Sequence, residues 1–112
     1  MKIVTAVIKP LKLDDVTDAL TALGVGGVTV LEVKGFGQQR GRTDLYGSDF
    51  HAAQYLSKLR VEVAVMDEMV DQVVEAIISA AHTGRLGDGK VFVTDLMQVV
   101  RIRNHETGND AL

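Results

Sequence analysis

TGRLGDGK, residues 83–90, joins an amphipathic helical pattern to a run of β-branched residues. Its glycines can adopt positive φ angles without steric cost, so consecutive N–H groups can face one anion, and Lys90 would add a positive charge. A helix ending at His82 would also use a capping glycine, which explains Gly84 but not the run from Gly87 to Lys90. The stretch is neither a Walker A loop nor a Rossmann fingerprint, so a phosphate-binding loop and a plain helix-to-strand connection both remain open.

The residues on either side of this loop predict two strands and a helix. Apolar and polar residues alternate from 59 to 65, as in a strand with one solvent-facing side. Apolar residues then recur at helical spacing, with Asp67 as the expected N-cap: Val70, Val73, Val74, Ile77 and Ala81. A last strand is predicted over 91–99, and its extension would place Arg101 and Arg103 on the same side. The polar residues 104–112 are expected to form a mobile tail.

The first half of the chain repeats this order. Residues 3–8 form an apolar, β-branched run that ends before Pro10, the only proline. A helical stripe follows, with aspartates in its first turn and Gly24 at its end: Leu13, Val16, Leu20 and Leu23. Residues 28–34 then alternate as a second strand. The order β-α-β, long loop, β-α-β predicts an α+β fold of the ferredoxin-like βαββαβ type, an antiparallel four-stranded sheet with two helices on one face.

Composition limits the class of protein. The 112 residues show no break in composition, so a single domain over 1–112 is predicted, small enough to gain from burial through self-association. No apolar run reaches the length of a membrane span and no signal peptide is visible, so a soluble, cytoplasmic protein is expected. The absence of cysteine excludes disulfides and thiol catalysis. The net charge of −3 argues against nucleic acid as a partner.

A long loop is predicted over 37–57, where neither the helical nor the strand period is present. Structureless loops beyond about 12–15 residues are uncommon in small domains and are usually functional or disordered. Apolar side chains that a solvated linker would not need lie in or beside it: Phe36, Leu45, Tyr46 and Phe50. A functional loop is therefore favoured.

Four blocks of sequence, in this order and at this spacing, match one protein family: KPLKL (9–13), EVKGFG (32–37), TGRLGDGKVFV (83–93) and RIR (101–103). The chain resembles the P-II nitrogen regulatory proteins from end to end. The resemblance implies a homotrimeric signal transduction protein, not an enzyme, with nucleotide sites in the clefts between subunits. ATP and ADP would compete there, and 2-oxoglutarate would bind together with Mg²⁺ when ATP is present. The long loop would regulate a partner enzyme or transporter of nitrogen metabolism, with membrane contact only through a transporter.

The resemblance also implies the site residues. The nucleotide would be held by Thr29, Gly37, Gln38, Ala64, Gly87, Asp88, Gly89, Lys90, Arg101 and Arg103, although the family often has a larger aliphatic residue where this chain has Ala64. Of these, Arg101 and Arg103 would reach the phosphates across the subunit boundary. Without the resemblance, both would be interpreted as solvated charges at the end of a strand. Gln39 and Lys58 would serve 2-oxoglutarate, and the amide oxygen of Gln39 suits Mg²⁺.

The long loop departs from the family pattern. Many bacterial members carry a tyrosine at the loop apex that receives a nucleotidyl group, and this chain has Phe50 and His51 there, so no modification is expected at either residue. Tyr46 and Tyr55 do not match the acceptor position, and Ser48 lies one place away from a serine that is phosphorylated in some relatives. Gly47 replaces an arginine found in relatives that block ammonium channels, so channel blocking is in doubt, with Arg40 or Arg42 as substitutes.

Three alternatives remain beside a nitrogen regulator. A specialised relative could regulate another transporter, for metal efflux or carbon uptake. A nucleotide hydrolase would need a positioned carboxylate and histidine pair or an activated nucleophile, and the sequence offers none, so any turnover would be slow. RNA binding would need aromatic side chains on central strands, and Phe92 is the main one available. A metal site at His51 or His82 has only the weak partner Asp49 in support.

Overall fold

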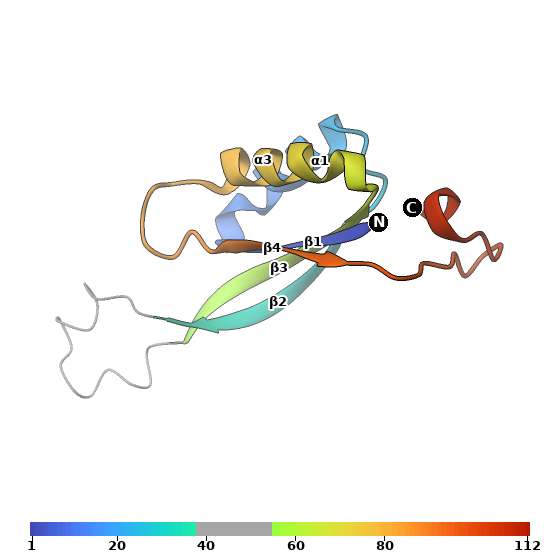
Figure 1. The fold of residues 1–112 in the computed structure, drawn as a ribbon. Coiled ribbons are helices and arrows are strands. Elements are labelled where there is room, and N and C mark those ends of the chain that lie inside the picture. Colours follow the sequence, from blue (N-terminus) through green and yellow to red (C-terminus); the bar gives the residue numbers. More distant parts are fainter. Residues whose placement is uncertain (38–54) are drawn as a thin grey trace, which may run out of the picture.

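The first apolar run of the sequence becomes an inner strand of the sheet, β1 (Lys2–Ile8). In the computed structural model, which describes residues 1–37 and 55–112, the sheet has four strands in the order β2-β3-β1-β4. Every neighbouring pair is antiparallel. Helices α1 (Leu13–Ala22) and α3 (Val70–Ala81) cover one face of the sheet (Figure 1). The predicted ferredoxin-like α+β arrangement is confirmed.

The second and third strands form a hairpin that projects beyond the rest of the sheet (Figure 1). Strands β2 (Thr29–Phe36) and β3 (Tyr55–Val65) pair along their length, from Thr29 opposite Glu62 to Phe36 opposite Tyr55. The prediction of a loop over 37–57 was therefore wrong at its far end, because residues 55–57 belong to β3. Cross-strand pairing with β2 extends the strand beyond its own alternating pattern.

The hydrophobic core lies between the helices and the sheet. Alternation along β1 and β3 directs every second side chain to the helices, and the apolar stripes of α1 and α3 meet them. The buried apolar residues are Val4, Ala6, Ile8, Val16, Leu20, Val61, Val63, Val65, Val73, Ile77 and Ala81. The core is thus aliphatic, as the low aromatic content requires.

No helix among residues 1–37 and 55–112 covers the opposite face of the sheet (Figure 1). Register places Leu31, Arg60 and Phe92 on this open face, since Leu31 lies opposite Arg60, and Phe92 opposite Thr5. Leu31 is 43% exposed and Phe92 is 50% exposed. Large apolar side chains on an open sheet face favour a contact with another protein surface.

The C-terminal part departs from the sequence prediction. Strand β4 (Lys90–Asp95) ends four residues before the predicted Val99. Residues 101–104 form a turn, so Arg101 and Arg103 do not lie on a strand extension. The polar tail, expected to be mobile, has defined local structure. Val100 bridges Thr107, and a short 3₁₀ helix, Gly108–Ala111, follows.

Asp67 does not cap α3 as predicted. It begins a 3₁₀ turn, Asp67–Met69, that precedes the helix, and its carboxylate accepts a hydrogen bond of 2.8 Å from the Met1 ammonium group. This ion pair lowers the pKa of Asp67. A hydrogen bond from a charged amine to a carboxylate is stronger than one from a backbone amide. The Asp67 carboxylate therefore binds the Met1 ammonium group instead of the N–H groups at the start of α3. No helix in the described part of the chain has the length and apolarity needed to cross a membrane.

Candidate ligand-binding site

The glycines of the 83–90 loop adopt the backbone conformation that the sequence predicts. Gly84, Gly87 and Gly89 have φ angles of 81°, 95° and 94°. Gly89 also lies directly against β1, because a β-carbon at this position would be 1.6 Å from the Val7 carbonyl oxygen. No L-residue can occupy that space without moving β1 or the loop. The loop is therefore a shaped backbone element docked on an inner strand.

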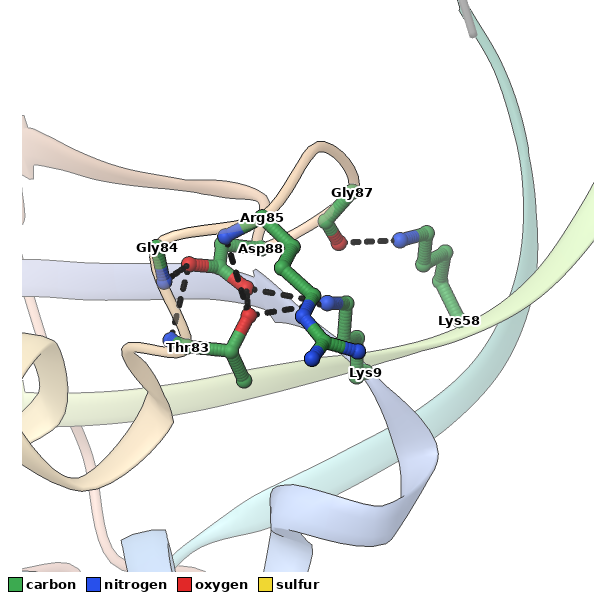
Figure 2. A network of polar contacts seen from close by, with 7 residues as sticks. All are labelled: Lys9, Lys58, Thr83, Gly84, Arg85, Gly87 and Asp88. Carbon is green, nitrogen blue, oxygen red and sulfur yellow. Dashed lines mark hydrogen bonds and ion pairs between the residues drawn. The ribbon is translucent and has the colours of Figure 1, made fainter. Parts of the chain in front are cut away.

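A polar network closes the loop on itself (Figure 2). One carboxylate oxygen of Asp88, Oδ2, accepts hydrogen bonds of 2.9 Å from the N–H groups of Thr83 and Gly84. The other oxygen, Oδ1, accepts a hydrogen bond from the Thr83 hydroxyl and pairs with the Lys9 ammonium at 3.1 Å. Lys9 also donates to the Thr83 hydroxyl at 3.0 Å. The Thr83 hydrogen bonds and the contact with Lys9 hold the pKa of Asp88 well below its usual range.

Lys58 reaches the same loop from β3. Its ammonium group donates to the Gly87 carbonyl oxygen (Figure 2). Burial, together with the nearby charge of Lys9, lowers the pKa of Lys58. Its aliphatic stem passes over Gly35 on β2, where a β-carbon would be 3.3 Å from the Lys58 Cγ. Lys58 thus connects β3, on which it lies, with β2 and with the glycine-rich loop.

A pocket of about 460 Å³ brings together five of the predicted phosphate and effector residues. Its walls come from the ends of β2, β3 and β4 and from the glycine-rich loop. These five are Gly37, Lys58, Gly87, Gly89 and Lys90, and they lie beside Gly35, Phe36 and Phe92. In the described part of the chain, Lys90 has no ion-pair partner, so its charge is available to an anion.

Thr29 and Ala64, also predicted to hold the nucleotide, line a different pocket of about 240 Å³. This pocket also contains Ile3 and Glu62, and the C-terminal Leu112 reaches it. The larger pocket contacts β1 at Val7 and the smaller one at Ile3, four residues apart along an extended strand, or about 14 Å. The predicted nucleotide-binding residues of one chain are therefore divided between two separate pockets.

The two predicted arginines join neither pocket. The side chain of Arg101 donates to the Asp110 carbonyl oxygen at 3.2 Å and pairs with Glu106 at 3.5 Å, within its own tail. Arg103 is exposed. Because both residues lie in the turn after β4, their side chains do not line either pocket.

Several predictions lie outside the described residues. These concern Gln38 as a nucleotide contact, Gln39 as a 2-oxoglutarate and Mg²⁺ ligand, and the loop residues Arg40, Arg42, Tyr46, Gly47, Ser48, Phe50 and His51. Among residues 1–37 and 55–112, no group of three or more His, Asp or Glu side chains could hold a metal ion.

Sequence reasoning did not identify Lys9 or Gly35 as part of this site. Lys9 directly precedes the only proline, at the end of β1, and its position there brings its ammonium group to Asp88. A lysine at the end of an inner strand indicates a site residue only when the loop is already known to pack against that strand. Gly35 is a glycine within a strand, a position that often marks a close approach by another group.

Comparison with known proteins settles the family. A family model described as "Nitrogen regulatory protein P-II" matches residues 1–106. The chain belongs to the P-II family. It is 54% identical to "Nitrogen regulatory protein P-II" of Rhizobium etli and 51% identical to the protein of that name from Azospirillum brasilense. It is 46% identical to "Nitrogen regulatory protein GlnK" of Escherichia coli K12, and each of these alignments covers the whole of both chains.

These P-II relatives are named as regulators rather than as enzymes. Because each alignment spans the whole of both sequences, the glycine-rich loop, the hairpin and the C-terminal tail all fall within the aligned region. The P-II fold and the regulatory class of this chain follow from these findings.

Proposed function

We propose that this P-II chain senses adenine nucleotides and 2-oxoglutarate and passes the signal to a partner enzyme or transporter of nitrogen metabolism. The observation that carries the proposal is the meeting of Lys58 with the glycine-rich loop in one pocket. Loop amides and Lys90 suit the phosphates of ATP or ADP, and the Lys58 ammonium suits a carboxylate of the keto acid.

Mg²⁺ would be held between the phosphates and the effector, as a hard cation that prefers oxygen ligands. The described residues supply cationic and amide donors for the anions, and the predicted metal contact is Gln39, outside the described residues. On this proposal the metal requires both the nucleotide and the keto acid, so effector binding depends on ATP.

The complete nucleotide site would form between copies of the chain in a homotrimer. Three observations support this: the open sheet face, the separation of the Thr29 pocket from the Lys90 pocket, and the absence of Arg101 from the lining of either pocket. A neighbouring copy would bring the missing part of each site. A closed ring of identical subunits buries the same apolar face on every one.

Calorimetric titration tests the ligand assignment. MgATP is titrated into the protein with and without 2-oxoglutarate, and the titration is repeated on Lys58→Ala and on Lys34→Ala. Lys34 lies on the same hairpin but projects to the opposite face, since it pairs with Ser57. We expect ATP to bind all three proteins and 2-oxoglutarate binding to be lost only in Lys58→Ala. A wild-type protein that binds no ATP, or binds it without response to 2-oxoglutarate, would contradict the proposal.

A loop-deleted chain tests partner regulation. Phe36 and Tyr55 are directly paired at the end of the hairpin, so a short glycine turn can replace residues 38–54 without changing strand register. The full chain is immobilised, a nitrogen-assimilating cell extract is applied, and retained proteins are eluted with ATP and 2-oxoglutarate. We expect specific elution from the full chain and none from the deleted chain. Equal retention by both would place partner recognition elsewhere.

A further inference from the structure

The side chain of Asp88 is already fully used by the protein. A carboxylate offers about four lone-pair positions, and four donors approach this one: the amides of Thr83 and Gly84, the Thr83 hydroxyl and the Lys9 ammonium (Figure 2). The three hydrogen bonds close a loop of only six residues, from 83 to 88. The Asp88 carboxylate therefore has no free hydrogen-bonding position for a ligand, and its contacts fix the conformation of the loop.

The same contacts decide which loop donors are left for an anion. The amides of Thr83 and Gly84 point at Asp88, and the amide of Arg85 donates to the Thr83 hydroxyl at 3.2 Å. The first half of the loop is thus turned inward. Any anion must be bound by residues 87–90, the half that lines the larger pocket.

Two attachments hold this arrangement on β1. Gly89 rests on the Val7 carbonyl, and Lys9, two residues further along, ties Asp88 to the end of the strand. The side chains of Lys9 and Asp88 are only 28% and 23% exposed, so the pair is shielded from much of the solvent. Lys9 also offsets the negative charge of the Asp88 carboxylate within the loop.

We infer that Lys9, Thr83 and Asp88 form a positioning unit that shapes the phosphate-binding half of the loop without contacting the phosphates. The inference deepens the proposed nucleotide site and rests on it. It assigns Asp88 a different role from the direct contact that family resemblance implies. It also adds Lys9 and Thr83, which that resemblance does not name.

Affinity for ATP and for adenosine, measured by calorimetry, separates positioning from ligand contact. Adenosine lacks the phosphates, so its affinity should be unchanged by any variant of the unit. Thr83→Val and Asp88→Asn should each weaken ATP binding by about tenfold or more, the effect of losing one hydrogen bond to a charged group. Thr83→Ser keeps the hydroxyl and should restore affinity to within about twofold. If Asp88 merely faced the phosphates, Asp88→Asn would strengthen ATP binding, which would overturn the inference.

A double-variant cycle decides how Lys9 acts. If Lys9 works through Asp88, Lys9→Met combined with Asp88→Asn should be no weaker than Asp88→Asn alone. Additive losses would mean that Lys9 binds the phosphates directly, and the inference would fail for Lys9. Lys12→Met is the matched control, because Lys12 pairs with Asp15 at 3.8 Å instead of with the loop.

Hydrogen exchange tests the unit without a nucleotide. The amides of Thr83 and Gly84 should be protected in the ligand-free wild type and should exchange faster in Asp88→Asn, with no change in the amides of α3. Unchanged exchange at both amides would overturn the inference whatever the protein binds. A wild type that shows this protection but binds no ATP would contradict the proposed nucleotide site alone.

Discussion

The α-carbon of Gly89 lies so close to the Val7 carbonyl oxygen that a β-carbon there would be 1.6 Å from it. The loop and the inner strand are therefore in direct backbone contact, and only glycine allows it. The φ angle of 94° adds a second reason, since L-residues rarely adopt it.

Gly89→Ala should destabilise the protein by about 2 kcal/mol or more, because the clash forces the loop away from β1. Gly84→Ala also has a positive φ but its nearest atom is the His82 side chain at 3.7 Å, so about 1 kcal/mol is expected. Gly26→Ala, with open space around it, is the control. Chemical denaturation measures all three, and equal losses for Gly89→Ala and Gly26→Ala would refute the backbone contact.

Gly35→Ala should impair effector binding more than stability. The new methyl group would press on the Lys58 Cγ at 3.3 Å and displace the ammonium group from the pocket. We expect 2-oxoglutarate affinity to fall by about tenfold while ATP affinity without effector stays within about twofold. In Lys58→Ala, where effector binding is already lost, adding Gly35→Ala should leave ATP affinity within about twofold. A marked loss of ATP affinity in the double variant would show that Gly35 acts independently of the lysine.

The pKa of Lys58 gives a pH dependence with a definite sign. Because burial lowers it, the folded chain holds fewer protons at Lys58 than the unfolded chain between the lowered and the ordinary value, so this group's contribution to stability rises with pH there. Effector binding needs the charged form and should weaken as pH rises through the same window. Lys58→Arg keeps its charge and should show no such weakening in titrations of 2-oxoglutarate. Parallel pH profiles for the two proteins would count against Lys58 as the effector contact.

Leu31→Asp should dissociate the proposed trimer. Leu31 lies on the open face, 43% exposed, and a carboxylate there would bury an added charge at the subunit contact, where its cross-strand neighbour Arg60 already pairs with Glu62. Val30 is its matched control, 40% exposed but on the helix-facing side of β2, opposite Val61. Sedimentation velocity should show a trimer for wild type and Val30→Asp and a 12.1 kDa monomer for Leu31→Asp. A monomeric wild type would rule out the trimer itself.

Leu20→Ala should cost about 2–5 kcal/mol, the usual range for removing a fully buried leucine. Its side chain is 0% exposed between α1 and the sheet. Leu11→Ala removes the same atoms from a residue that is 95% exposed and should change stability by less than about 0.5 kcal/mol. Urea denaturation compares the two, and similar losses would mean that Leu11 is covered in solution.

The sequence predicted the fold well where hydrophobic periodicity was strong. Val61, Val63 and Val65 alternate in the sequence and are all buried in β3, and the stripe of α3 buries Val73 and Ile77 as expected. Apolar and polar residues alternate only along the part of a strand that has one buried face. The alternation therefore does not predict the outer part of the hairpin, where cross-strand pairing alone extends β3 to Tyr55.

The candidate site was predictable in part. The glycines of the loop were recognised because positive φ has a residue signature. Lys9 was not, because its contact with Asp88 joins residues 79 positions apart and depends on the docking of two elements. Arg101 and Arg103 were misplaced onto a strand, since an Arg-Ile-Arg alternation looks the same in a strand and in a tight turn.

β1 is synthesised first, and both of its partners come from the second half of the chain. It pairs with β3 across up to 63 positions and with β4 across up to 93, from Lys2 to Val65 and to Asp95. A nascent chain still lacking β4 leaves an apolar inner strand with an unpaired edge. Such long sequence separations slow folding and expose the chain to mispairing on the way. The strand that carries the glycine-rich loop in the finished protein is therefore the one most dependent on the completion of synthesis.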